Sequence, residues 1–156
     1  MIQARTMGLP GTDIILIGEA KDLLDVAVEA KACKNWSISS FVRQSRDNLG
    51  QFTDWIVVAR RPGEREPIVI MDNYYACKLV MLPRDCRCRI YEAKRPYVVK
   101  WLDEIRSEVG IGKEWVASVY LPGDTIYFME YSYYLEKLKN LVERRRNNVR
   151  QLRRHS

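Results

Sequence analysis

Apolar residues in the first half of the chain fall into short buried or alternating runs and one helical stripe. Short apolar runs bounded by turn residues predict buried strands, and apolar residues at helical spacing predict a helix that covers them. The helix has Ser37 or Ser39 at its start and Gly50 as a left-handed stop. The predicted strands lie at 13–18, 24–31, 55–59 and 67–71, and the helix falls between the second and third strands.

The second half of the chain repeats this outline, with gaps of one to three residues. A recurring order of this kind indicates a duplicated supersecondary unit, although hairpins also reuse Trp, Pro and Gly by chance. Both interpretations stay open from the sequence. The recurrences are Glu29-Ala30-Lys31 as Glu92-Ala93-Lys94, Trp55 as Trp115, Pro62-Gly63 as Pro122-Gly123, and Met71-Asp72 as Met129-Glu130.

These patterns predict an α/β fold with a mixed central sheet flanked by helices. Leu and Val at helical spacing predict two more helices, at 97–109 and from Tyr133 to Arg154. The 156 residues make one domain of ordinary size. Within it we distinguish a core at 1–80, a C-terminal α/β extension or degenerate repeat at 81–138, and a basic helical tail at 139–156.

Composition excludes several classes of protein. With 47% hydrophobic and 29% charged residues, wholesale disorder is ruled out. No apolar run approaches the ~20 residues that cross a bilayer, and no secretory signal is visible. We therefore expect no membrane association and a cytoplasmic location, with the four cysteines reduced. Cys86 and Cys88 with the single His155 far away make a poor zinc site.

The net charge is concentrated at the C-terminus. Residues 139–156 hold seven basic side chains and one acidic side chain, which accounts for the whole net charge of +6. Clustered Lys and Arg attract polyanions because they displace counterions from phosphates. The tail therefore indicates nucleic-acid binding, and the alternative is a solvated helix end.

One group of charged residues has the chemistry of a metal-dependent hydrolase. A hairpin turning near residue 21 places Asp13 opposite Glu29, and strand alternation puts Lys31 on the same face as Glu29. Two carboxylates can hold Mg²⁺, which polarises a phosphate and activates a water, while a Lys orients that water. The alternative is an ordinary exposed Glu-Lys pair on a strand. In the second half, Asp85 stands too close to Glu92 to face it across a hairpin, so Glu92 and Lys94 receive no catalytic role.

These residues resemble the PD-(D/E)XK nucleases, and within them the archaeal-type Holliday-junction resolvases and their phage and prophage relatives. The resemblance spans about residues 5 to 80 and rests on the order and spacing of short motifs. They are Gly11-Thr12-Asp13-Ile14, Val28-Glu29-Ala30-Lys31, a helix with Arg43-Gln44, and the strand Trp55 to Ala59 followed by Arg60-Arg61-Pro62-Gly63.

The resemblance implies a restriction-endonuclease-like core and a Mg²⁺-dependent endonuclease acting on branched or recombining DNA, with Mn²⁺ as a substitute. It implies that Asp13, Glu29 and the Ala30 carbonyl hold the metal, that Lys31 is the catalytic lysine, and that Gln44 faces the site. Two symmetric nicks require a homodimer. A phage or prophage gene would place the protein in a bacterial host cell. The expected DNA-binding residues are Lys34, Arg43, Arg46, Arg60, Arg61, Arg144, Arg145 and Arg146.

The sequence departs from the family pattern at two points. Thr12 stands where the family name has proline, and the twelve residues before Asp13 lack the acidic residue that a first helix donates in these resolvases. These departures keep a second interpretation open, in which the chain is a catalytically inert DNA-binding or partner-binding protein with a nuclease fold.

Overall fold

The computed structural model describes residues 2–4, 14–16, 25–80, 90–93 and 98–156. The predicted site residue Asp13, as well as Asp85, Cys86, Cys88 and Lys94, lies outside the described residues. The first half contains the four strands and the helix that the apolar pattern predicts, together with a short strand and a helix that it did not. The elements are β1 (Ile2–Ala4), β2 (Ile14–Leu16), β3 (Val26–Ala32), α2 (Ile38–Asp47), β4 (Asp54–Arg60), β5 (Ile68–Asp72) and α3 (Asn73–Val80), of which β1 and α3 are the additions.

The local signals around α2 act much as expected. Ser37 occupies the N-cap position, but its hydroxyl donates a hydrogen bond to the Ser40 hydroxyl at 2.9 Å instead of capping the helix. Gly50 has a φ of 59° in the turn that follows, a conformation that glycine adopts without strain. The second half contains β6 (Ile90–Ala93), α4 (Val98–Val109), β7 (Val116–Leu121), β8 (Asp124–Glu130) and α5 (Tyr131–Arg154).

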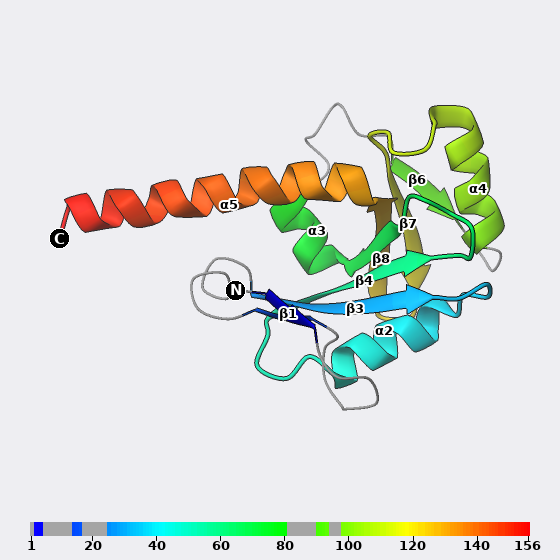
Figure 1. The fold of residues 1–156 in the computed structure, drawn as a ribbon, viewed down its shortest axis with the longest axis horizontal. Helices are drawn as coiled ribbons and strands as arrows, with labels where there is room; N and C mark the ends of the chain where they lie inside the picture. Colours follow the sequence, from blue (N-terminus) through cyan, green and yellow to red (C-terminus); the bar gives the residue numbers. More distant parts are fainter. Residues whose placement is uncertain (1, 5–13, 17–24, 81–89, 94–97) are drawn as a thin grey trace.

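The described strands form one mixed sheet in the order β1-β2-β3-β4-β5-β8-β7-β6. The coarse class predicted from the sequence, α/β with a mixed sheet flanked by helices, is therefore confirmed. Helices α2 and α4 cover one face, where Phe41 and Leu102 pack with Trp55 and Trp115. Helices α3 and α5 cover the other face, where Tyr75 and Tyr133 pack with Met71 and Met129 (Figure 1).

The two halves of the chain are arranged about a pseudo-two-fold axis at the centre of the sheet. Strand β5 pairs with β8 in antiparallel fashion, and Ile70 faces Phe128 at the middle of the ladder. On either side of that pair the order of strands is mirrored, since β3-β4-β5 is followed by β8-β7-β6. The sheet therefore continues across residue 80, the boundary between the core and extension distinguished above.

The sequence between residues 38 and 64 aligns without a gap with the sequence 60 residues later, and Arg, Gly, Trp and Pro-Gly recur at equivalent positions. Ile38 and Val98 each begin a helix, and Gly50 and Gly110 both have positive φ. The buried Trp55 and Trp115 occupy equivalent places in β4 and β7. The recurrence noted in the sequence thus corresponds to a structural repeat.

One equivalence proposed from the sequence is wrong. The parallel ladders pair Glu29 with Val57 in the first half and Tyr91 with Ala117 in the second half. Val57 and Ala117 are 60 residues apart, so the equivalent of Glu29 is Tyr91 and not Glu92. Glu92 has the same two following residues as Glu29, Ala and Lys, but it stands one position further along its strand than the equivalent of Glu29.

Helix α5 packs on the body only in its first half. Leu141 is buried and Leu138 packs against the same cluster, whereas every residue from Arg146 onward is exposed. Its last turns extend away from the sheet as a free-standing arm (Figure 1). Val149 and Leu152, which belong to the apolar spacing that predicted this helix, are 42% and 72% exposed.

A buried tyrosine pair joins α3 to α5. The hydroxyls of Tyr75 and Tyr134 lie 3.1 Å apart and hydrogen-bond to each other. Burial raises the pKa of Tyr75 to about 12 and raises that of Tyr134 well above its ordinary range. Both phenols are therefore neutral between these helices, because burial disfavours the phenolate form.

Candidate functional site

The hairpin that leads into the candidate site has the predicted register. Ile14 of β2 faces Val28 of β3 in an antiparallel pair. This is the register in which the preceding residue, Asp13, was expected to face Glu29, although Asp13 itself lies outside the described residues.

Glu29 is a buried carboxylate in the middle of β3. Its side chain is on the sheet face covered by α2, and the residue is only 2% exposed. The side-chain amide of Asn48, just after α2, donates a hydrogen bond to Glu29 Oε1 at 3.1 Å. A carboxylate buried to this degree needs hydrogen-bond donors or a cation beside it, because desolvation disfavours its charge.

Lys31 lies two residues further along β3 and is half-buried on the same face. Its ammonium donates a hydrogen bond to Gln44 Oε1 on α2. The Lys31 Nζ also lies 5.8 Å from the centroid of the Phe41 ring, within reach of a cation–π interaction. The structure thus brings three of the predicted catalytic residues, Glu29, Lys31 and Gln44, to the face of β3 that α2 covers.

Asn48 was missed in the sequence. The signal was available, because Asn48 follows Gln44 by four residues and residues at this spacing share a helix face. The two amides meet two charged residues that alternate along β3, so Gln44 contacts Lys31 and Asn48 contacts Glu29. Each amide holds one charged side chain in a defined orientation.

The donor chemistry on this part of β3 fits a hard cation in part. A carboxylate oxygen and a backbone carbonyl are oxygen ligands of the type that Mg²⁺ prefers. Glu29 and Ala30 supply this combination on consecutive residues of β3. Within the described ranges, no three Asp, Glu, His or Cys side chains converge as a cation-binding group. Among the residues that the structure describes, Glu29 is thus the acidic side chain that would contribute to a cation site on β3.

The predicted DNA-binding residues near this site differ in how they are engaged. Lys34, Arg43 and Arg60 are exposed around α2 and the end of β4. Arg46, although half exposed, forms an ion pair with Asp124 of the second half. Arg61 forms a two-pronged hydrogen bond with Asp103, which raises the pKa of the guanidinium above its ordinary value.

The predicted basic residues on α5 begin where the helix leaves the body. Arg144 donates a hydrogen bond to the Lys78 carbonyl of α3 at 3.3 Å. Arg145 is half-buried and Arg146 is exposed. Arg150 and Arg153 continue the exposed row, so the arm presents guanidinium groups to solvent.

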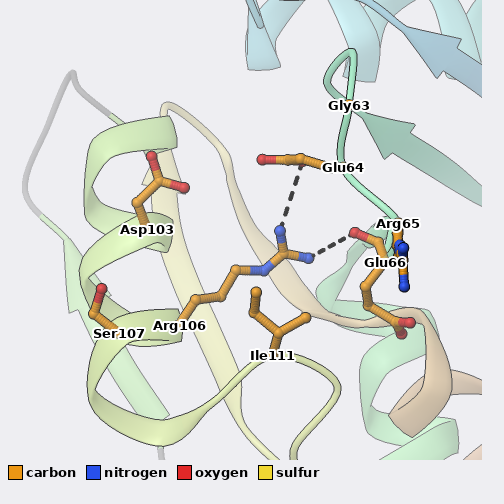
Figure 2. Close-up of a pocket in the computed structure, with 8 residues that line it drawn as sticks. All are labelled: Gly63, Glu64, Arg65, Glu66, Asp103, Arg106, Ser107 and Ile111. Carbon is orange, nitrogen blue, oxygen red and sulfur yellow. Dashed lines mark hydrogen bonds and ion pairs between the residues drawn. The ribbon is translucent and has the colours of Figure 1, made fainter.

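A pocket of about 720 Å³ lies between α4 and the turn at 63–66, and its counterpart lies between α2 and the turn at 121–124. Figure 2 shows Arg106 at the wall of the pocket beside α4, with its guanidinium directed at Glu64 and at the Glu66 carbonyl. Arg106 also forms two hydrogen bonds, of 2.8 and 2.6 Å, with the fully buried Glu130. The Trp115 indole donates to the same carboxylate at 3.3 Å. Arg106 is therefore held by structural partners.

No family model matches the chain, and no curated protein or solved structure is significantly similar to it. In the part of the chain that the structure describes, no helix is both long and apolar enough to span a bilayer. The geometry of β3 and α2 and the charge of α5 are therefore the features that bear on the function.

Proposed function

We propose that this chain is a metal-dependent endonuclease that hydrolyses phosphodiester bonds in DNA, with branched or recombining DNA as its substrate. The observation that carries the proposal is that Glu29 and Lys31 lie on one face of β3, where Asn48 contacts Glu29 and Gln44 contacts Lys31. In this proposal the core at 1–80 has a restriction-endonuclease-like fold, and the chain acts as a homodimer on branched DNA. If the gene belongs to a phage, the protein works in the cytoplasm of the bacterial host.

Glu29 and the Ala30 carbonyl would hold Mg²⁺, and Asp13 is expected to complete the site. When bound, the cation polarises the phosphate and favours the hydroxide form of a water. Lys31 would direct its ammonium at the scissile phosphate and stabilise the negative charge that develops there. Gln44 keeps this ammonium in place. In net terms, a water oxygen bonds to phosphorus, one P–O bond to a sugar breaks, and a water proton ends on the leaving sugar oxygen.

The exposed arginines of α5 support DNA as the partner. Each guanidinium that contacts a phosphate releases a counterion, so a row of them gives affinity without sequence preference. Lys34, Arg43 and Arg60 would bind phosphates closer to the cut. In this proposal, cleavage depends on Glu29 and Lys31 of β3. Much of the affinity for DNA comes from the exposed arginines at the end of α5.

The test is cleavage of four-way, flap, linear duplex and single-stranded DNA with Mg²⁺, Mn²⁺ or a chelator. We expect cutting with either metal, loss of cutting in the chelator, and loss of cutting but not of binding in Lys31→Ala and Glu29→Gln. Glu104→Gln is the matched control, because Glu104 occupies the place of Gln44 in the second half. It should cut like the unchanged chain.

The alternative is an inert DNA-binding protein with a nuclease fold. Two observations favour it. The described part of the site contributes a single acidic side chain, Glu29, and the exposed end of α5 is basic. Binding of DNA without cutting under both metals would establish this alternative and overturn the nuclease proposal.

A further inference from the structure

Helix α5 carries a seam of mostly apolar side chains that continues onto the free-standing arm (Figure 1). Its positions recur in alternating steps of three and four residues, the spacing at which two helices pack side by side. Leu138 packs against the core, but Val149 and Leu152 lie on the arm, and Leu135 is 43% exposed. The apolar side chains at both ends of the seam are therefore exposed to solvent. The seam consists of Leu135, Leu138, Val142, Arg145, Val149 and Leu152.

A row of basic side chains follows the same repeat along one side of the seam. Leu135, Val142 and Val149 are seven residues apart, and each is followed four residues later by a basic residue. Residues four apart lie on neighbouring turns of one helix face, so each of these apolar side chains has a cation beside it. We call this row the basic flank. It consists of Lys139, Arg146 and Arg153, which are all exposed.

The arm has little to stabilise it as an isolated helix in water. Arg146, Arg150 and Arg154 follow one another at intervals of four residues, where like charges repel. Every residue from Arg146 onward is exposed, so packing on the body does not compensate for this repulsion. Short helices gain most of their stability by packing an amphipathic face. The arm would therefore be stabilised by a partner that covers the seam and supplies negative charge.

The pattern of charge and apolar residues selects the kind of partner. A second copy of α5 is unfavourable, because residues 144–156 contain six arginines and no acidic side chain, so pairing in either direction opposes like charges. DNA phosphates satisfy the arginines but leave Val149 and Leu152 in water. A bilayer surface favours a broad apolar face with aromatic residues, and residues 144–156 contain no Phe, Tyr or Trp. A helix with an apolar row and an acidic row at the same repeat complements both the seam and the basic flank.

We infer that the seam and the basic flank dock an amphipathic helix of a partner protein, which carries Leu or Val in its apolar row and Glu or Asp beside that row. The apolar side chains of this helix pack on Val142, Val149 and Leu152, and its carboxylates pair with Arg146 and Arg153. Because these two arginines also belong to the residues proposed to contact phosphates, the partner helix and DNA share them. The docking itself does not depend on the proposed nuclease activity.

The test is titration of the full chain with a synthetic helical peptide of three heptads, which has Leu along one face and Glu on both sides of it. A peptide of the same composition with its Leu residues distributed around the helix is the electrostatic control. We expect the matched peptide to bind at least about 10-fold more tightly than the control, because it alone buries apolar side chains on the seam. Val149→Ala with Leu152→Ala should weaken binding of the matched peptide at least about 10-fold, without loss of helix propensity.

Asn147→Ala with Gln151→Ala is the matched control variant, because these residues lie on the opposite side of the same helix, and it should bind like the unchanged chain. Absence of binding, equal binding of the two peptides, or undiminished binding in the Val149→Ala, Leu152→Ala variant would overturn the inference. So would a loss, in that variant, of self-association in sedimentation velocity, of binding to phosphatidylglycerol vesicles, or of affinity for duplex DNA, since the seam would then serve a second copy, a membrane or DNA. Cleavage assays decide the nuclease proposal separately.

Discussion

Arg46 and Arg106 occupy equivalent positions of α2 and α4, and each forms an ion pair with the turn of the opposite half. Arg46 pairs with Asp124, and Arg106 lies 3.6 Å from Glu64. Asp124 and Glu64 are also equivalent, each following a Pro-Gly turn. The two contacts are thus reciprocal and tie the halves together on the helical face of α2 and α4.

The environments of these two arginines differ, and this predicts unequal stability effects. Arg106→Ala would leave the buried Glu130 without its cation, so we expect a loss of about 3 to 5 kcal/mol in the free energy of unfolding. Arg46→Ala removes a half-exposed ion pair and should cost about 0.2 to 1 kcal/mol. Urea unfolding of both variants measures the difference. Similar losses in the two would contradict the structural role given to Glu130.

Asn48 is predicted to position Glu29. Asn48→Ala removes the amide that donates to Glu29 Oε1, so we expect about a 10- to 100-fold slower cleavage, the usual effect of removing a partner that orients a metal ligand. The Mg²⁺ concentration for half-maximal cleavage should also rise, and Asn48→Asp should not restore it because a carboxylate cannot donate. Glu108→Ala, at the equivalent place in α4, is the control. A slower rate with unchanged metal dependence would count against the positioning role.

The exposed row on α5 is predicted to set the salt dependence of DNA binding. Replacing Arg146, Arg150 and Arg153 by Gln should lower the slope of log affinity against log salt by about 2 to 3 if all three contact phosphate. Stability should not change, because these side chains lie on the free arm. Lys100→Gln on α4 serves as the control and should leave the slope as it is. An unchanged slope in the triple variant would move DNA binding to Lys34, Arg43 and Arg60.

The Tyr75–Tyr134 pair predicts a loss of stability at high pH. Both phenols have raised pKa values in the folded chain, that of Tyr75 to about 12, whereas an unfolded tyrosine ionises near 10.0. Unfolding therefore releases protons above pH 10, so the free energy of unfolding is unaffected by these groups below pH 10 and falls between pH 10 and 12. Tyr75→Phe should reduce this fall by up to roughly 1.4 kcal/mol per pH unit. Urea unfolding at pH 8, 10 and 11 measures it.

Much of the local structure could be predicted because apolar spacing and turn residues act over short distances. The strands around Glu29 and Trp55 and the helix that ends before Gly50 lie where these signals place them. Strand β1 and helix α3 were missed, since Ile2–Ala4 is too short to show alternation and α3 follows β5 without a separating turn. Local patterns cannot mark such a junction.

The arrangement of the halves could not be predicted, because it depends on contacts between distant residues. The pairing of Ile70 with Phe128 leaves no local signal in either strand. The contacts of Gln44 and Asn48 likewise depend on how α2 crosses β3. The sequence therefore indicated which residue types could form the candidate site, whereas the ladder register was needed to decide which residues are equivalent in the two halves.

The central pairing of β5 with β8 has a consequence for synthesis on the ribosome. Strand β5 ends at Asp72 and β8 begins at Asp124, so β5 emerges well before its partner exists. At typical translation rates the delay is about 3 to 10 s. During that time the buried backbone of Val69 and Ile70 forms an open, apolar sheet edge, which is a template for aggregation. Until its own second half closes the sheet, the nascent first half is therefore open to strand pairing with other chains.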